Sequence, residues 1–96
     1  MGNWSRMSKV IIKKLSKNEF KEKGIQKWQI WTCEASTFPW EYTDKESCYI
    51  LEGYVDVELE NGDKLSIGPG DFVVFPKGLK CVWHVQKAIK KHFIFD

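Results

Sequence analysis

Cysteine and histidine, residue types that often serve as nucleophiles and as zinc ligands, are few in this chain and widely separated. They comprise three cysteines and two histidines: Cys33, Cys48, Cys81, His84 and His92. None of the cysteines belongs to a CxxC pair, and no cysteine–histidine cluster has the spacing of a zinc site. Because an odd number of cysteines cannot all be paired in disulfides, we expect reduced thiols in a reducing compartment, and therefore a cytoplasmic protein.

The residues around Cys81 alternate in the way that a strand requires. Cys81, Trp83 and Val85 would share one face of this strand, which places His84 on the opposite face. A thiol acts as a nucleophile only when neighbouring groups hold it as a thiolate, and Lys77 at the preceding turn is the nearest candidate cation. We therefore expect both histidines to have surface or packing roles.

Length and composition indicate one small folded domain. The 96 residues are 43% hydrophobic, 15% aromatic and 29% charged, which excludes low-complexity disorder, collagen-like repeats and a coiled coil. No apolar run approaches the ~18 residues of a membrane span, and no signal peptide opens the chain. Residues 1–9 fit no element, and we interpret them as an N-terminal extension that expression cloning could have added. Residues 10–96 are then the single domain.

The net charge of +2 hides an uneven distribution along the chain. Residues 1–27 carry eight basic and two acidic groups, whereas residues 28–72 carry two basic and ten acidic groups. A basic N-terminal segment could contact nucleic acid, but its lysines are mixed with Glu19 and Glu22, and Arg6 is the one arginine of the chain. Because guanine and phosphate recognition both favour arginine, we expect neither nucleic acid nor a membrane as a partner.

One helix is expected, over residues 17–23. Ser16 and Glu19 have the spacing of a capping box, and Gly24 follows as a signal for the helix end. From Trp28 onward, short runs rich in aromatic and β-branched residues alternate with turns, which favours a β-sandwich or a barrel. Strands are expected over residues 10–12, 28–33, 48–59 with a break at Gly53, 64–67, 72–75, 79–85 and 91–95. Between residues 59 and 64, the Asn61-Gly62 pair predicts a tight type I′ hairpin.

Two segments with their spacing resemble the conserved motifs of the cupin fold. The first runs from Glu46 to Gly53, and the second is Gly70, five further residues and Pro76-Lys77-Gly78. The likeness is greatest to small single-domain cupins related to (S)-ureidoglycine aminohydrolase, and it also involves Cys81-x-Trp83-x-Val85 and Lys91-His92-Phe93. The resemblance implies an all-β fold, the cupin-type double-stranded β-helix (a jelly-roll barrel), with one short N-terminal helix.

The resemblance also implies where a cupin metal would be held. Metal-binding cupins present two histidines, a glutamate and a final histidine from neighbouring strands to a divalent ion. In this chain the four positions correspond to Trp40, Tyr42, Glu46 and Cys81, so Glu46 alone remains of the usual ligands. We therefore predict no metal cofactor, with manganese or another divalent ion as the alternative.

The same positions imply a pocket at the mouth of the barrel. Trp40, Tyr42, Glu46, Cys81 and Trp83 are expected to face the cavity as ligand-binding residues. Glu46 could act there as a general acid or base and Cys81 as a nucleophile, so these two are the candidate catalytic residues.

We interpret the chain as a small cupin that binds an unidentified small molecule in its barrel, without the usual metal. Two alternatives stay open: a metal-dependent enzyme of the ureidoglycine aminohydrolase type that acts on a small ureido compound, and a non-catalytic structural or interaction cupin. A homodimer is compatible with all three. Lys90 and Lys91 are expected to be solvated.

Overall fold

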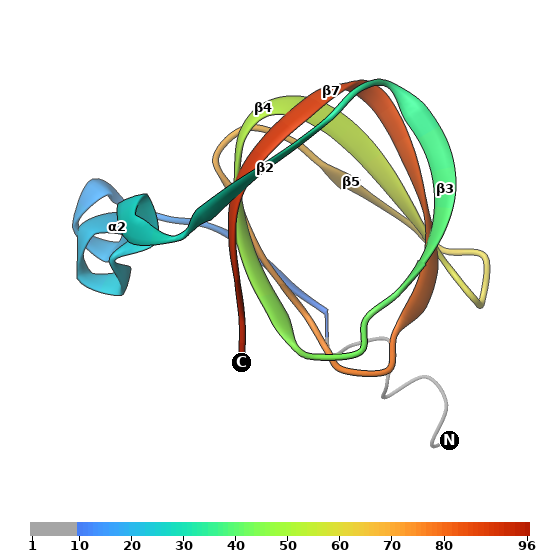
Figure 1. The fold of residues 1–96 in the computed structure, drawn as a ribbon, viewed down its shortest axis with the longest axis horizontal. Helices are drawn as coiled ribbons and strands as arrows, with labels where there is room; N and C mark the ends of the chain where they lie inside the picture. The colour runs from blue at the N-terminus through green and yellow to red at the C-terminus, as the bar shows by residue number, and fades with distance from the viewer. Residues whose placement is uncertain (1–9) are drawn as a thin grey trace.

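The computed structural model describes residues 10–96, which form an antiparallel β-barrel with one short helix beside it (Figure 1). The predicted all-β class with a single N-terminal helix is confirmed, and the extension predicted over residues 1–9 lies outside the described residues. No helix within residues 10–96 is both long enough and apolar enough to cross a membrane. In chain order the elements are β1 (Ile11–Lys14), α2 (Lys17–Lys23), the 3₁₀ turn η1 (Ile25–Lys27), β2 (Gln29–Cys33), β3 (Ser36–Glu41), β4 (Glu46–Leu59), β5 (Lys64–Ile67), β6 (Asp71–Phe75) and β7 (Lys80–Phe95).

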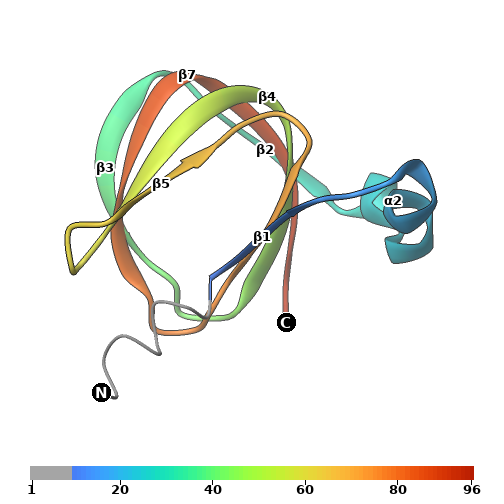
Figure 2. The ribbon, with the colours of Figure 1, turned by 180° about the vertical axis from the view of Figure 1, so that it is seen from behind.

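Two long strands, β4 and β7, pair along most of their lengths and organise the barrel. Their register runs from Glu46 opposite Phe95 to Leu59 opposite Cys81. Beyond β4 the sheet continues through β6 to β1, while β5 pairs with the C-terminal half of β4. Both β2 and β3 pair with β7, and the two opposite views show the strands curving around a common interior (Figures 1 and 2). The strands predicted separately over residues 79–85 and 91–95 are therefore parts of one strand, and β3 was not predicted.

The helix α2 begins and ends where the sequence predicted. The Ser16 hydroxyl accepts a hydrogen bond from the Glu19 amide (3.1 Å), and the Glu19 carboxylate accepts one from the Ser16 amide (2.9 Å). Gly24 then ends the helix in the left-handed conformation, at φ +67°. These contacts satisfy amide and carbonyl groups that a helix end would otherwise leave unbonded.

The predicted break at Gly53 is instead an irregularity within one continuous strand. The pairing of β4 with β7 shifts register between Ile50 and Val55. Before the shift the even-numbered residues from Glu46 to Ile50 are buried, and after it the odd-numbered residues from Val55 to Leu59 are buried. Because strand side chains alternate between faces, the extra residue in this bulge keeps both halves of β4 facing the core.

The turn between β4 and β5 differs from the predicted type I′ hairpin. The Gly62 amide donates to the Leu59 carbonyl (2.9 Å), and the Leu59 amide donates to the Asp63 carbonyl (2.8 Å). Gly62 has φ +93°, but Asn61 does not adopt a positive φ. A type I′ turn requires positive φ at both central residues, so this loop is the three-residue kind, a type I turn followed by a left-handed glycine.

Candidate functional site

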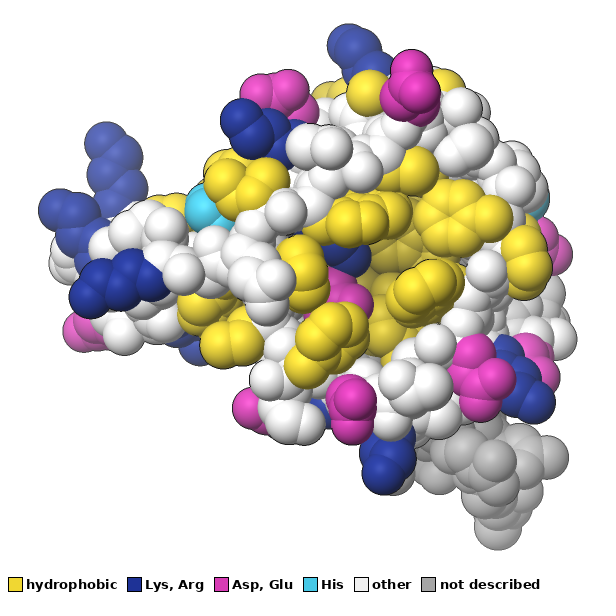
Figure 3. All heavy atoms as spheres, viewed as in Figure 1, with side chains coloured by type: hydrophobic (Ala, Val, Ile, Leu, Met, Phe, Trp, Pro, Cys, Tyr) yellow, Lys and Arg dark blue, Asp and Glu magenta, His cyan; other side chains and the backbone are white. Residues whose placement is uncertain are grey.

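One end of the barrel interior is hollow and lined mainly by aromatic rings. The cavity has a volume of about 240 Å³. On the face seen in Figure 1, hydrophobic side chains surround a hollow that has acidic and basic side chains at its depth (Figure 3). The lining residues are Trp31, Phe38, Trp40, Tyr42, Glu46, Trp83, Lys91, Phe93 and Phe95.

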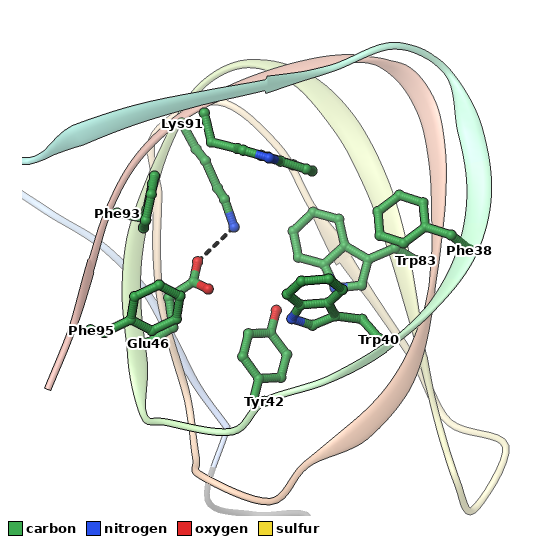
Figure 4. A pocket seen from close by; sticks show the side chains of 9 residues that line it. Phe38, Trp40, Tyr42, Glu46, Trp83, Lys91, Phe93 and Phe95 are labelled. Atoms are coloured by element: carbon green, nitrogen blue, oxygen red, sulfur yellow. Dashed lines mark hydrogen bonds and ion pairs between the residues drawn. The ribbon is translucent and has the colours of Figure 1, made fainter.

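Four of these side chains were expected at the cavity, and local structure explains how they reach it. Trp40 lies on β3 and Trp83 on β7, and the pairing of these strands places Trp40 opposite Cys81. Tyr42 follows β3 directly. Its amide donates to the Leu79 carbonyl (2.9 Å) and its carbonyl accepts from the Gly78 amide (2.6 Å). Glu46 is the first residue of β4 and projects inward from it (Figure 4).

Glu46 forms an ion pair with Lys91 inside the cavity, which the sequence analysis did not predict. The Lys91 Nζ and Glu46 Oε2 atoms are 2.6 Å apart, and the two side chains are only 6% and 4% exposed (Figure 4). The Lys91 ammonium also lies 4.7 Å from the ring centre of Trp83 and 5.0 Å from that of Trp31. Aromatic faces attract a cation, so the rings and the carboxylate together stabilise a charge that burial alone would disfavour.

The prediction that Lys91 is solvated was therefore wrong. In β7 the odd-numbered residues Cys81, Trp83 and Val85 face inward, and after an exposed stretch over residues 86–88 the odd-numbered Ile89 and Lys91 are buried again. Read as one strand through residues 80–95, this alternation would have placed Lys91 inside the barrel. Because two separate strands with a loop between them were predicted here, this alternation was not followed as far as Lys91.

Two buried hydrogen-bond donors of the cavity wall have no partner within the described residues. These are the Tyr42 hydroxyl and the Trp83 Nε1. The Tyr42 ring stacks on Phe75 with 4.6 Å between ring centres, and its hydroxyl points toward the middle of the barrel (Figure 4). Burial, and then the nearby Glu46 carboxylate, raise the pKa of Tyr42 well above its ordinary value. The Trp83 N–H lies close enough to Tyr42 to offset this rise in pKa only in part, so the hydroxyl is protonated at neutral pH.

Cys81 is not among the residues that line the cavity. Its Sγ lies 3.7 Å from the Trp40 carbonyl, within the core. Burial raises the pKa of the Cys81 thiol to about 11, and it raises that of Cys48 to about 12. Since the thiolate is the nucleophilic form and this thiol keeps its proton at neutral pH, the geometry gives no support to the catalytic role expected of Cys81 from the sequence.

The residues at the cupin metal positions do not fit a divalent ion. The Trp40 indole offers no ligand atom, the Tyr42 hydroxyl keeps its proton, and the Glu46 carboxylate is already bonded to an ammonium group. Between residues 10 and 96 there is no group of three or more His, Cys, Asp or Glu side chains that could hold a metal. His84 instead pairs with Glu58 (2.9 Å), and His92 lies 3.2 Å from the Trp28 carbonyl.

An antiparallel barrel with a side-chain-lined pocket at one end is consistent with the jelly-roll architecture of the cupins. Residues 20–93 match the EutQ-like cupin domain, and the chain belongs to this family. It is 45% identical to a DUF861 family protein from Thermotoga maritima, with a TM-score of 0.90 over 92% of this chain and 100% of that chain.

More distant solved structures share the fold alone. The EutQ protein of Clostridium difficile is 22% identical, with a TM-score of 0.64 over 90% of this chain and 66% of that chain. An acireductone dioxygenase from Bacillus anthracis, with a cadmium ion in its active centre, is 15% identical, with a TM-score of 0.62 over 90% of this chain and 77% of that chain. No curated protein matches the chain. The cupin resemblance is confirmed, whereas a relationship to ureidoglycine aminohydrolase is not shown.

Proposed function

We propose that the barrel binds a small molecule with a flat apolar body and an oxygen acceptor, and that it does so without a metal ion. The observation that carries this proposal is the aromatic cavity with a buried ion pair inside it. In its wall, Tyr42 Oη and Trp83 Nε1 are buried donors that form no hydrogen bond of good geometry within the described residues. Buried polar groups are nearly always hydrogen-bonded, and leaving one unbonded costs about 1–3 kcal/mol. Each donor atom exposes less than 1 Å², so a ligand oxygen reaches it only when the covering rings move, and it would then remove that cost.

The shape and charge of the cavity narrow the class of ligand. A volume of about 240 Å³ lies below the roughly 300–1,000 Å³ of pockets for drug-sized molecules. Its aromatic walls suit a planar body, because stacked and edge-on rings pack closely against one another. The Lys91 ammonium has three N–H donors and gives one to Glu46, so further donors can meet an acceptor. A carboxylate, amide or carbonyl group on a single ring meets these requirements.

Titration with simple ring compounds tests this proposal. Benzoate and benzamide are expected to bind, as measured by calorimetry and by a rise in Tm, whereas toluene, which lacks an acceptor, binds at least tenfold more weakly. Tyr42→Phe should weaken benzoate binding by about 2- to 12-fold, because it removes one hydrogen bond of about 0.5–1.5 kcal/mol.

Tyr54→Phe is the matched control, since Tyr54 is 53% exposed and does not line this cavity. Its affinity for benzoate should equal that of the wild type. The proposal would be contradicted if both variants lost the same affinity for benzoate, or if toluene bound as tightly as benzoate. It would also be contradicted if neither benzoate nor benzamide bound.

The metal-dependent aminohydrolase alternative makes a different prediction. Protein purified without chelator and then offered Mn, Fe, Ni and Zn should contain no metal above background by elemental analysis, because Lys91 already neutralises the Glu46 carboxylate. Near-stoichiometric metal that is lost in Glu46→Ala would overturn the metal-free proposal, and assays with ureido compounds would then follow.

A homodimer remains a proposal that accompanies the binding function. Ile30 of β2 and Ile94 of β7 are 53% and 41% exposed, and they lie on adjacent strands. Exposed hydrophobic residues of this kind are compatible with a contact to a second copy. The same surface would serve the non-catalytic alternative, in which the barrel is an interaction module.

A further inference from the structure

We infer that the Lys91 amine reacts reversibly with a small aldehyde or ketone in the cavity to form an imine. This inference rests on the proposed function, because the carbonyl compound has to enter the same aromatic cavity. It adds a covalent step and a chemical class of ligand, and it assigns that step to one atom, Lys91 Nζ.

The surroundings of Lys91 are those of a reactive lysine rather than a surface lysine. Its ammonium is nearly excluded from solvent, with rings of Trp31 and Trp83 about it and the carboxylate of Glu46 beside it. It is also the one lysine among the residues that line the cavity (Figure 4). Lysines that form Schiff bases in proteins are often held in hydrophobic pockets. Lys91 shares the burial and the aromatic walls of such sites, and it has in addition a carboxylate within hydrogen-bond distance.

Glu46 provides the proton transfers that imine formation needs. Its Oε2 atom is 2.6 Å from Lys91 Nζ, so it can accept a proton from the ammonium and leave a neutral amine. The neighbouring Lys90 lies on the other face of β7 and has no such partner among the described residues.

The reaction balances without an oxidant or a reductant. The lone pair of the neutral amine attacks the carbonyl carbon and the C–N bond forms. One of the two protons on the attacking nitrogen then moves to the carbonyl oxygen, which gives a neutral carbinolamine. Glu46 then returns its proton to the departing hydroxyl group, and the C–O bond breaks with release of one water. The product is a protonated imine, which keeps the positive charge next to the Glu46 carboxylate. The protonated Tyr42 hydroxyl is the donor available to the carbonyl oxygen during the attack.

A purely structural ion pair is the competing explanation, and it predicts no covalent product. Lys91→Arg distinguishes the two, because arginine keeps the positive charge and the pairing with Glu46 but cannot form an imine. Lys90→Arg is the matched control, one residue away on the opposite face of the same strand. Glu46→Gln retains the amine but removes the group that accepts and returns the proton.

The experiment traps the imine by reduction. Protein is incubated with benzaldehyde at neutral pH, reduced with sodium cyanoborohydride, and examined by intact mass and peptide mapping. We expect one benzyl group per chain, located on Lys91 and formed at least tenfold faster than on any other lysine. The product should be absent in Lys91→Arg, unchanged in Lys90→Arg and slowed at least tenfold in Glu46→Gln.

Peptide mapping of the wild-type adduct needs no variant, so the result does not depend on how well the variants fold. Benzyl groups spread evenly over the lysines, or no adduct at all, would overturn the inference. Benzoate titration of the same sample separates the two proposals. If benzoate binds and no Lys91 adduct forms, imine formation is wrong while the binding function stands; if benzoate does not bind either, both fail.

Discussion

Replacing Glu46 by Gln is expected to lower the free energy of unfolding by about 3–5 kcal/mol, because the Lys91 ammonium would be left buried without a counter-charge. The wild-type pair is almost fully buried, with its charged atoms 2.6 Å apart. Urea unfolding followed by tryptophan fluorescence measures the loss. Changing both partners, in the variant Glu46→Leu/Lys91→Met, should recover stability to the wild-type value or exceed it by about 1–4 kcal/mol, because an apolar pair avoids the cost of burying charge.

The exposed ion pair between Lys45 and Asp96 provides the control. Its side chains are 52% and 69% exposed with 3.2 Å between the charged atoms, so Asp96→Asn should cost less than about 1 kcal/mol. If Glu46→Gln were as mild as Asp96→Asn, the Glu46–Lys91 pair would have to be hydrated in solution. A double variant that is more stable but no longer binds benzoate would show that the ion pair serves the pocket rather than the stability of the barrel.

Replacing Gly53 by Ala should destabilise the barrel by more than about 4 kcal/mol or prevent folding. Gly53 has φ +93°, and a Cβ atom there would overlap the Ala88 carbonyl oxygen and lie 2.6 Å from the carbonyl oxygen of Lys87. These are backbone atoms of β7, so relief of the clash would require the two longest strands of the barrel to separate. Urea unfolding, or the yield of folded protein judged by circular dichroism, measures the effect.

Gly62 offers a matched comparison, because it has the same φ of +93° but no atom within 4 Å of a Cβ position. Gly62→Ala therefore reports the conformational cost of a left-handed residue alone, about 1–2 kcal/mol. The difference between the two variants isolates the steric contact with β7. Equal losses at both positions would mean that β4 and β7 are not held together at Gly53 as the structure shows.

Features that depend on neighbours in sequence were predictable. The helix over residues 17–23 was predicted at both ends, because Ser16, Glu19 and Gly24 satisfy the helix termini within a few residues of themselves. The barrel class followed from short apolar strands separated by glycine and proline turns. The hairpin at Asn61-Gly62 was placed correctly but its type was wrong, because one extra loop residue changes the turn geometry without changing the turn signal.

The cupin motifs predicted which end of the barrel holds the pocket, but they predicted only in part which side chains border it. They pointed to Trp40, Tyr42, Glu46 and Trp83, and the structure brings these four side chains together in one cavity. They also pointed to Cys81, which faces the core beside Trp40 and does not reach the cavity. Strand alternation assigns a residue to a face, but it does not show which inward-facing residues border empty space and which are packed over.

The sequence by itself therefore determined the local order of elements, the all-β class and the end of the barrel that holds the cavity. The tertiary structure alone decided that Lys91 faces Glu46 across 45 residues of chain, and that the Tyr42 hydroxyl and Trp83 Nε1 are buried without a partner in the described residues. The physical reason is that pairing and burial depend on the register of β4 against β7. That register is set by the bulge at Gly53 and by packing across the whole barrel, and no short stretch of sequence contains it.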